Sequence, residues 1–130
     1  PDGVLMRIDL LPAIRDQILL VVIDALDEGR IEMYGGAMPS PGGPAGALQV
    51  VIALGADPAV ESEGAAILVG GQVGVRVADG AITWARLFDR DGVAIIDMDV
   101  APSGAVMSIS DPEGVIGGTV TLNPSSVAVA

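Results

Sequence analysis

The sequence predicts a mainly β protein, an antiparallel β-sandwich with one N-terminal α-helix, and three observations lead to this. At 130 residues the chain is long enough for one core, so we expect a single domain over residues 1–130. Apolar residues make up 51% of the chain and aromatic residues only 2%, so branched aliphatic side chains that suit strands must fill the core. The 18 glycines and nine prolines fall mostly between short apolar runs, which is typical of many strands joined by turns.

The first expected element is an amphipathic helix at about residues 12–28. Its apolar side chains recur at helical spacing, at Ile14, Ile18, Val21, Val22 and Ala25. Asp9 could cap its start and Gly29 its end. The β-branched run at 21–23 lowers helix propensity, so a strand over 18–23 is the alternative.

After this helix the sequence predicts eight or nine strands. They are expected at 30–34, 47–54, 65–69, 72–77, 81–88, 93–100, 106–110, 115–122 and 127–130. The segment 35–46 is rich in Gly and Pro and predicts an exposed loop, and 55–64 predicts an exposed acidic segment. Hairpin turns are expected at 78–80 and 89–92 because both contain Asp-Gly. Jelly-roll and immunoglobulin-like topologies both remain open.

Strand alternation in the second hairpin predicts which of its side chains are buried. Trp84 and Phe88 share one face with Ile82 and Arg86, and we expect both rings in the structural core. On the returning strand Asp97 and Asp99 point the other way from the apolar residues, so their face is expected to be wet.

The charge balance limits the partners. Seventeen acidic residues face six arginines, with no lysine or histidine, for a net charge of −11. Nucleic acid and anionic membranes attract basic patches, so we expect neither as a partner and infer a protein partner. The apolar run at 18–23 is bracketed by charges and is far short of the ~20 residues that span a bilayer. We expect a soluble acidic protein without a targeting segment.

The sequence lacks the residue types that most catalytic sites use, so we expect no enzyme, no catalytic residue and no cofactor. Without Cys, His or Lys the usual nucleophiles and bases are missing, and nothing marks an apolar pocket for a carboxylate pair. Asp89, Asp91, Asp97 and Asp99 form the densest carboxylate group, but a calcium loop needs further oxygen ligands at fixed offsets. A hairpin turn explains these residues better, and no metal site is predicted.

Several segments together resemble a family of small structural proteins of tailed bacteriophages and prophages. They are Leu11–Arg15, Ile31–Gly35 with the following loop at 39–44, Thr83–Gly92 with the later Asp97, and Gly117–Val120. The resemblance is densest in the Trp-Ala-Arg strand and Asp-rich turn at 83–92. It implies a virion component without catalytic residues, a capsid decoration or cement protein that is made in the host cytoplasm and lies on the outer surface of the capsid.

The functional expectation is therefore a decoration protein that bridges shell subunits. Its partners would be the major capsid protein or other virion proteins, and it would form a homo-oligomer, a trimer if it occupies threefold sites. The candidate interface residues are Ile18, Val22, Tyr34, Pro39, Pro41, Pro44, Val127 and Val129. The alternatives are a tail-fibre or baseplate module that binds a host-surface glycan, for which an exposed Tyr34 would serve as a platform, and a secreted bacterial β-sandwich domain.

Overall fold

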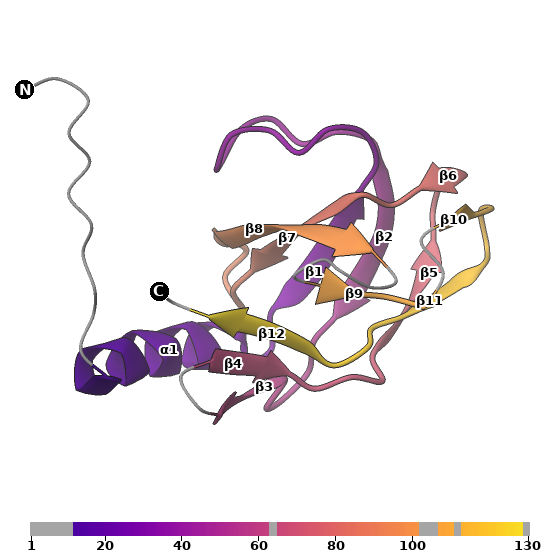
Figure 1. Ribbon diagram of the computed structural model, residues 1–130. Coiled ribbons are helices and arrows are strands. Elements are labelled where there is room, and N and C mark those ends of the chain that lie inside the picture. The colour runs from indigo at the N-terminus through magenta and orange to yellow at the C-terminus, as the bar shows by residue number, and fades with distance from the viewer. Residues whose placement is uncertain (1–11, 63–64, 102–106, 111–112, 129–130) are drawn as a thin grey trace, which may run out of the picture.

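The computed structural model describes residues 12–62, 65–101, 107–110 and 113–128, and within them a helix lies beside a set of strands (Figure 1). The helix α1 spans Pro12–Leu26. The strands are β1 (Arg30–Tyr34), β2 (Leu48–Ala53), β3 (Ala59–Ser62), β4 (Ala65–Leu68), β5 (Val73–Arg76), β6 (Gly80–Ala81), β7 (Trp84–Phe88), β8 (Ala94–Ala101), β9 (Met107–Ser108), β10 (Glu113–Gly114), β11 (Thr119–Thr121) and β12 (Ser125–Ala128).

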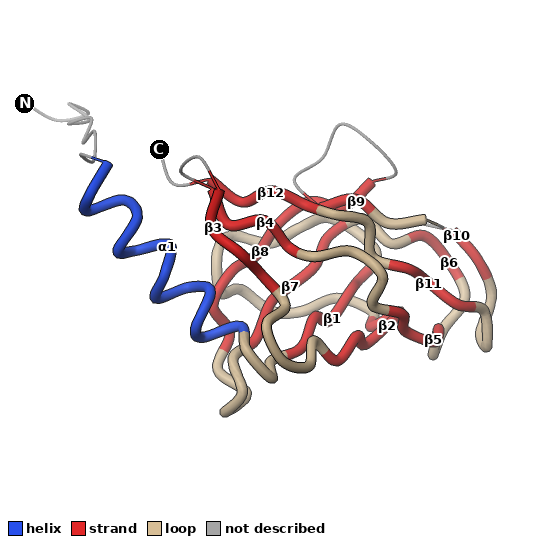
Figure 2. Tube along the Cα trace, turned by 90° about the horizontal axis from the view of Figure 1, so that it is seen from below, coloured by secondary structure: helices blue, strands red, loops and turns tan. Residues whose placement is uncertain are grey.

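Three sheets build the fold. The large sheet has seven strands in the order β11-β5-β2-β1-β7-β8-β9, antiparallel throughout except that β9 runs parallel to β8. A three-stranded sheet, β12-β4-β3, covers part of one face, and β6 pairs with β10 at the end away from α1 (Figure 2). The predicted fold class, a mainly β sandwich with one N-terminal helix, is confirmed.

The helix begins at Pro12 as expected and ends at Leu26, two residues before the predicted end. Glu28 takes the left-handed backbone conformation, with φ of 60°, and its N–H donates to Gly55 O at 2.7 Å. Gly29 is needed for close approach, because a Cβ there would lie 2.2 Å from Phe88 O. The alternative of a strand over 18–23 is wrong, and Asp9 lies outside the described residues.

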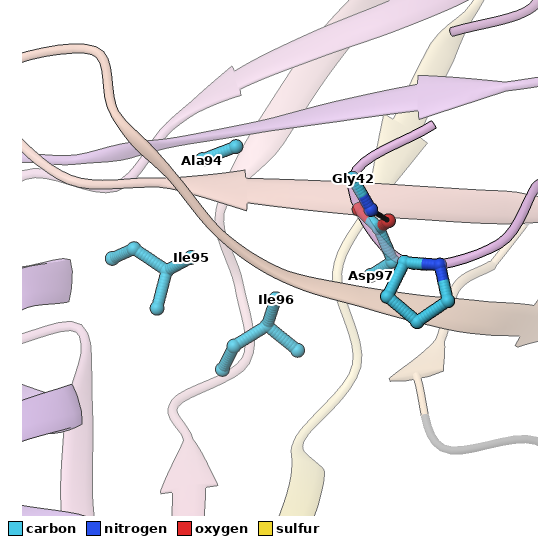
Figure 3. Close-up of a pocket in the computed structure, with 6 residues that line it drawn as sticks. Gly42, Ala94, Ile95, Ile96 and Asp97 are labelled. Atoms are coloured by element: carbon cyan, nitrogen blue, oxygen red, sulfur yellow. Dashed lines mark hydrogen bonds between the residues drawn. The ribbon is translucent and has the colours of Figure 1, made fainter. Parts of the chain in front are cut away.

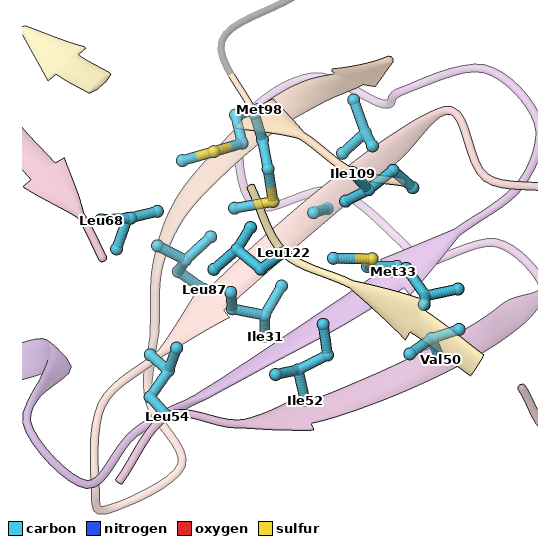
Figure 4. Packing of buried hydrophobic residues seen from close by; sticks show 14 of the residues in the cluster. Ile31, Met33, Val50, Ile52, Leu54, Leu68, Leu87, Met98, Ile109 and Leu122 are labelled. Atoms are coloured by element: carbon cyan, nitrogen blue, oxygen red, sulfur yellow. The ribbon is translucent and has the colours of Figure 1, made fainter. Parts of the chain in front are cut away.

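The core lies between the large sheet and the elements that cover it. The inward side chains of β1, β2 and β7 supply Ile31, Met33, Val50, Ile52, Ala85 and Leu87. From the other side they meet Leu68, Ile109 and Leu122 (Figure 4). Each fully buried side chain of this size contributes about 1.5–3 kcal/mol. No aromatic ring takes part in this cluster, so aliphatic residues and methionine fill it.

Two sequence predictions about the strands are wrong. The segment 55–64 was expected to lack a strand, but it contains β3, which pairs with β4; Glu61 is exposed as expected, and Glu63 lies outside the described residues. The turn at 78–80 does not close a hairpin, because β5 pairs with β2 and β11, whereas β7 pairs with β1 and β8. The buried side chain of Arg76, at the end of β5, donates to Gly80 O at 3.0 Å. This hydrogen bond holds the turn at 78–80 against β5.

The predicted strand at 81–88 is likewise interrupted. Ile82 is buried in the core, but Trp84 lies on the opposite face of the large sheet. Thr83 between them donates its N–H to Tyr34 O and accepts from Val100 N–H, outside the β7 ladder. The alternation therefore shifts at this point, and Ala85 and Leu87 share the core face with Met98.

Candidate interaction surfaces

The large sheet has an outer face, opposite the core, on which polar and aromatic side chains of β1, β7 and β8 stand in cross-strand rows. In one row Glu32 lies opposite Arg86, and Arg86 lies opposite Asp97. In the next row Tyr34 lies opposite Trp84. These rows determine what the loop at 35–46 rests on.

An ion pair fastens that loop to the sheet. Arg86 Nε donates to Asp97 Oδ1 at 2.7 Å and Nη2 to Oδ2 at 3.1 Å, and both side chains are about nine-tenths buried. The same Nη2 donates to Gly43 O, and Gly42 N–H donates to Asp97 Oδ2 at 3.0 Å. The hydrogen bond from Arg86 lowers the pKa of Asp97, and Asp97 in turn raises the pKa of Arg86. The face of β8 that was predicted to be exposed to solvent is therefore covered by the loop at Asp97.

The aromatic residues of this face are covered as well. Tyr34 is 3% exposed and stacks on Trp84 with 4.5 Å between ring centroids. Its hydroxyl donates to Glu32, and burial together with this bond raises the pKa of Tyr34. The expectation of an exposed Tyr34 is wrong, because the loop that follows it folds back over the sheet. Trp84 is fully buried, and its Nε1 has no acceptor among the described residues.

Phe88 is half-buried at the end of β7 and does not belong to the core cluster, so its predicted place in the core is wrong. The guanidinium of Arg30 lies 4.1 Å from the centre of its ring, and Arg30 Nε pairs with Glu32 Oε2 at 2.7 Å. The chain has only one Trp, one Tyr and one Phe, and of these rings Tyr34 and Trp84 are buried while Phe88 is partly exposed. The platform expected at Tyr34 is therefore not exposed.

The predicted loop prolines lie at the edge of this region. Pro41 and Pro44 are exposed and Pro39 is half-buried. Pro41 and Gly42 border a hollow of about 110 Å³ whose other walls are Ala94–Asp97 (Figure 3). Sites for small organic ligands have volumes of about 300–1,000 Å³, so this hollow is too small for such a ligand.

The helix exposes a second group of side chains. Ile14, Ile18, Leu20 and Val21 are 38–70% exposed, whereas Leu19 and Leu26 are buried against the strands. Ile18 was named as a candidate interface residue, and its side chain is exposed. Val22 was also named, but it is half-buried and packs against the core. Four exposed apolar side chains on 15 residues form what we call the helix face: Ile14, Ile18, Leu20 and Val21.

A third group was not predicted. On β5 the side chains of Val73 and Val75 are each 54% exposed, while Gly74 between them and Arg76 after them are buried. Val51 of β2 pairs with Val75, and Val77 is also exposed. The adjoining turn exposes Val115 and Ile116. We call this group the valine surface: Val51, Val73, Val75, Val77, Val115 and Ile116.

Gly74 is the sequence signal that could have revealed this surface. A glycine within an alternating strand often marks a close backbone approach. A Cβ at Gly74 would lie 2.5 Å from Val50 Cγ1 and 2.7 Å from Val51 O. The face of β5 that turns inward is therefore the one without a large apolar side chain, and the valines point outward.

The predicted C-terminal clasp is engaged within the chain itself. Val127 belongs to β12, where it pairs with Ala66 of β4. Val129 lies outside the described residues. The backbone of 125–128 is thus an edge strand of the three-stranded sheet.

The carboxylates of the second hairpin serve its turn. Asp89 Oδ1 accepts from the N–H groups of Asp91 and Val93, both at 2.9 Å. Arg90 donates to Asp24 O and so ties the turn to α1. Among the described residues no three acidic side chains are grouped so that they could hold a metal ion. Within the same residues, no helix has the length and apolarity to span a membrane.

Comparison with known proteins adds no family: no family model, curated protein or solved structure matches the chain.

Proposed function

We propose that the protein is a non-enzymatic structural protein that joins other protein subunits. In its specific form it is a decoration or cement protein on the outer surface of a tailed-phage capsid, bound to the major capsid protein. One observation supports this most: α1, which carries the helix face, and β5, which carries Val73 and Val75 of the valine surface, lie at opposite ends of the molecule (Figures 1 and 2). A protein that bridges two neighbours needs two such surfaces.

The covered outer face supports the same function. The bonds from Arg86 and Asp97 hold the loop at 35–46 in place, so little ordering is required when a partner binds. The net charge of −11 suits the outside of a shell, away from the packaged DNA. The phage setting itself comes from the sequence resemblance at 83–92.

Self-association belongs to the proposal and is assigned to the helix face. Ile14, Ile18 and Val21 are spaced by four and three residues and so form one stripe of α1. Copies that meet through this stripe would give a homo-oligomer, a trimer where the shell offers threefold sites.

Undecorated capsids test this function. The purified protein should sediment with them, and its mass in solution should exceed that of a monomer. Replacing Ile18 and Val21 together with glutamine should abolish the larger mass and leave the circular dichroism spectrum unchanged. Val93→Gln is the matched control, since Val93 is 59% exposed and lies outside both surfaces. A monomeric mass combined with no capsid binding would contradict the proposal.

A further inference from the structure

We propose that the valine surface binds an apolar protein surface bordered by arginine or lysine, and not a second copy of this chain. The inference rests on the proposed structural function and names the chemistry of one partner. It follows from the exposure of its apolar side chains, from the way they are held, and from the charges beside them.

The strand part of the valine surface is held in place by sheet pairing. This part joins Val51 and Val75 across a β-ladder, with Val73 and Val77 two residues to either side of Val75. Six exposed β-branched side chains in one region exceed the isolated apolar residues that ordinary surfaces carry. Stiff side chains of this kind lose little conformational freedom when a partner covers them.

The turn beside β5 is fixed by backbone hydrogen bonds. Gly118 N–H donates to Val115 O, and Gly117, with φ of 87°, supplies the left-handed conformation that the turn needs. Gly117 N–H donates to Arg76 O, and Arg76 N–H donates to Gly118 O. Asp79 Oδ1 accepts from Ile116 N–H at 2.7 Å. Val115 and Ile116, 65% and 64% exposed, are therefore displayed by an ordered turn.

The exposed charges beside this surface are acidic, because Asp79 and Glu113 are exposed beside the turn. Of the four arginines whose side chains the structure describes, Arg76 lies within this region but is buried and bonded to Gly80 O. The other three are engaged elsewhere: Arg30 with Glu32, Arg86 with Asp97, and Arg90 with the C-terminal part of α1.

This charge distribution selects the partner. Two copies meeting through the valine surface would bring Asp79 and Glu113 against like charges, on chains that each carry −11. Like charges at an interface disfavour that pairing, whereas a basic border on the partner is attracted. Around the helix face both signs are present, since Arg90 lies near Asp24, so the argument applies to the valine surface alone.

Two synthetic peptides test the inference. Both have an alternating valine and threonine centre, one flanked by arginines and the other by glutamates. The arginine-flanked peptide should bind at least about tenfold more tightly at low salt, and this advantage should shrink as salt rises. Backbone amide shifts should be confined to residues 73–77 and 115–118. Equal binding of the two peptides, or shifts elsewhere, would overturn the proposal.

Variants sharpen the test. Glu113→Lys should weaken binding of the arginine-flanked peptide and strengthen binding of the glutamate-flanked one, because it reverses one border charge. Asp91→Lys changes the net charge equally but lies in the exposed hairpin turn that Arg90 ties to α1, so it should leave the preference unchanged. Ile116→Thr should reduce binding of the arginine-flanked peptide with little change in fold. Sedimentation showing a dimer that depends on Ile116 would also refute the proposal.

Undecorated capsids separate this inference from the proposed function. If Ile116→Thr and Glu113→Lys bind capsids as the unmodified protein does, the assigned surface is wrong but the function stands. If capsids are not bound while the arginine-flanked peptide still contacts 73–77 and 115–118, the function fails and the surface assignment stands.

Discussion

Arg86 of β7 lies directly opposite Asp97 of β8, and the loop at 35–46 is bonded to both side chains. Gly42 donates to the carboxylate and Gly43 accepts from the guanidinium. One buried ion pair therefore joins two neighbouring strands to a loop far away in sequence. Hydrogen bonds to charged groups contribute about 1.5–3 kcal/mol each, so the position of the loop depends on this pair.

Removing one partner of this pair should be costly. We expect Asp97→Ala to lower the free energy of unfolding by about 3–5 kcal/mol, because Arg86 would remain buried without a counter-charge. Urea unfolding measures the loss. Replacing both residues, as Arg86→Met with Asp97→Leu, should cost less, since no buried charge is left. A loss of less than about 1 kcal/mol for Asp97→Ala would show that the pair behaves like an exposed one.

The same pair predicts how stability depends on pH. Arg86 holds the pKa of Asp97 below its ordinary value of 3.8, so the folded state favours the ionised carboxylate. This contribution is fully present above the pKa of the unfolded chain, about 3.9, and is lost as pH falls through the lower folded value. The stability advantage of the unmodified protein over Asp97→Asn should therefore be constant near neutral pH and shrink under acid conditions. An advantage that does not change with pH would refute the assignment.

The stacked pair Tyr34 and Trp84 predicts a large packing effect. Trp84→Ala should destabilise the fold by about 3–5 kcal/mol, because the ring is fully buried and stacks on Tyr34. Phe88→Ala should cost less, since Phe88 is only half-buried under Arg30. Thermal and urea unfolding of both variants give the comparison. A loss below about 1 kcal/mol for Trp84→Ala would mean that the ring is exposed.

Gly74 should not tolerate a side chain. Its Cβ would approach the Val51 carbonyl oxygen to 2.7 Å, and backbone cannot move aside as a flexible side chain can. We expect Gly74→Ala to cost about 1–3 kcal/mol through overpacking. Val73→Ala, on the exposed face of the same strand, should stay within about 0.5 kcal/mol and serves as the control. Equal stabilities would contradict the inward position of Gly74.

Local patterns in the sequence were sufficient for the helix and for the second hairpin. The apolar spacing of α1 is a property of consecutive residues, and Asp89–Gly92 carries its own turn chemistry, in which Asp89 accepts two backbone N–H groups. The β7–β8 pairing that follows from this turn is confirmed. In these places the residues that decide the structure are neighbours in the chain.

The valine surface and the covered Tyr34 depend on residues far apart in sequence. Alternation at 73–76 shows that valines share a face but not whether that face is inside, and the close approach of Gly74 to β2 decides the matter. Similarly, Tyr34 is buried on a face where it stacks on Trp84 and where Gly42 and Gly43 are bonded to β8 and β7. A single sequence does not reveal either long-range contact.

The position of β12 changes the expected effect of shortening the chain. A free tail at 127–130 could be deleted without unfolding, but Ser125–Ala128 pairs along its whole length with β4. Deletion of 125–130 would leave β4 paired with β3 alone, and two-stranded pieces are marginal in water. We therefore expect the deletion to speed amide exchange in β4, at residues 65–68, before any effect on capsid binding can be measured. Unchanged exchange in β4 together with weaker capsid binding would contradict this and restore the idea of a clasping tail.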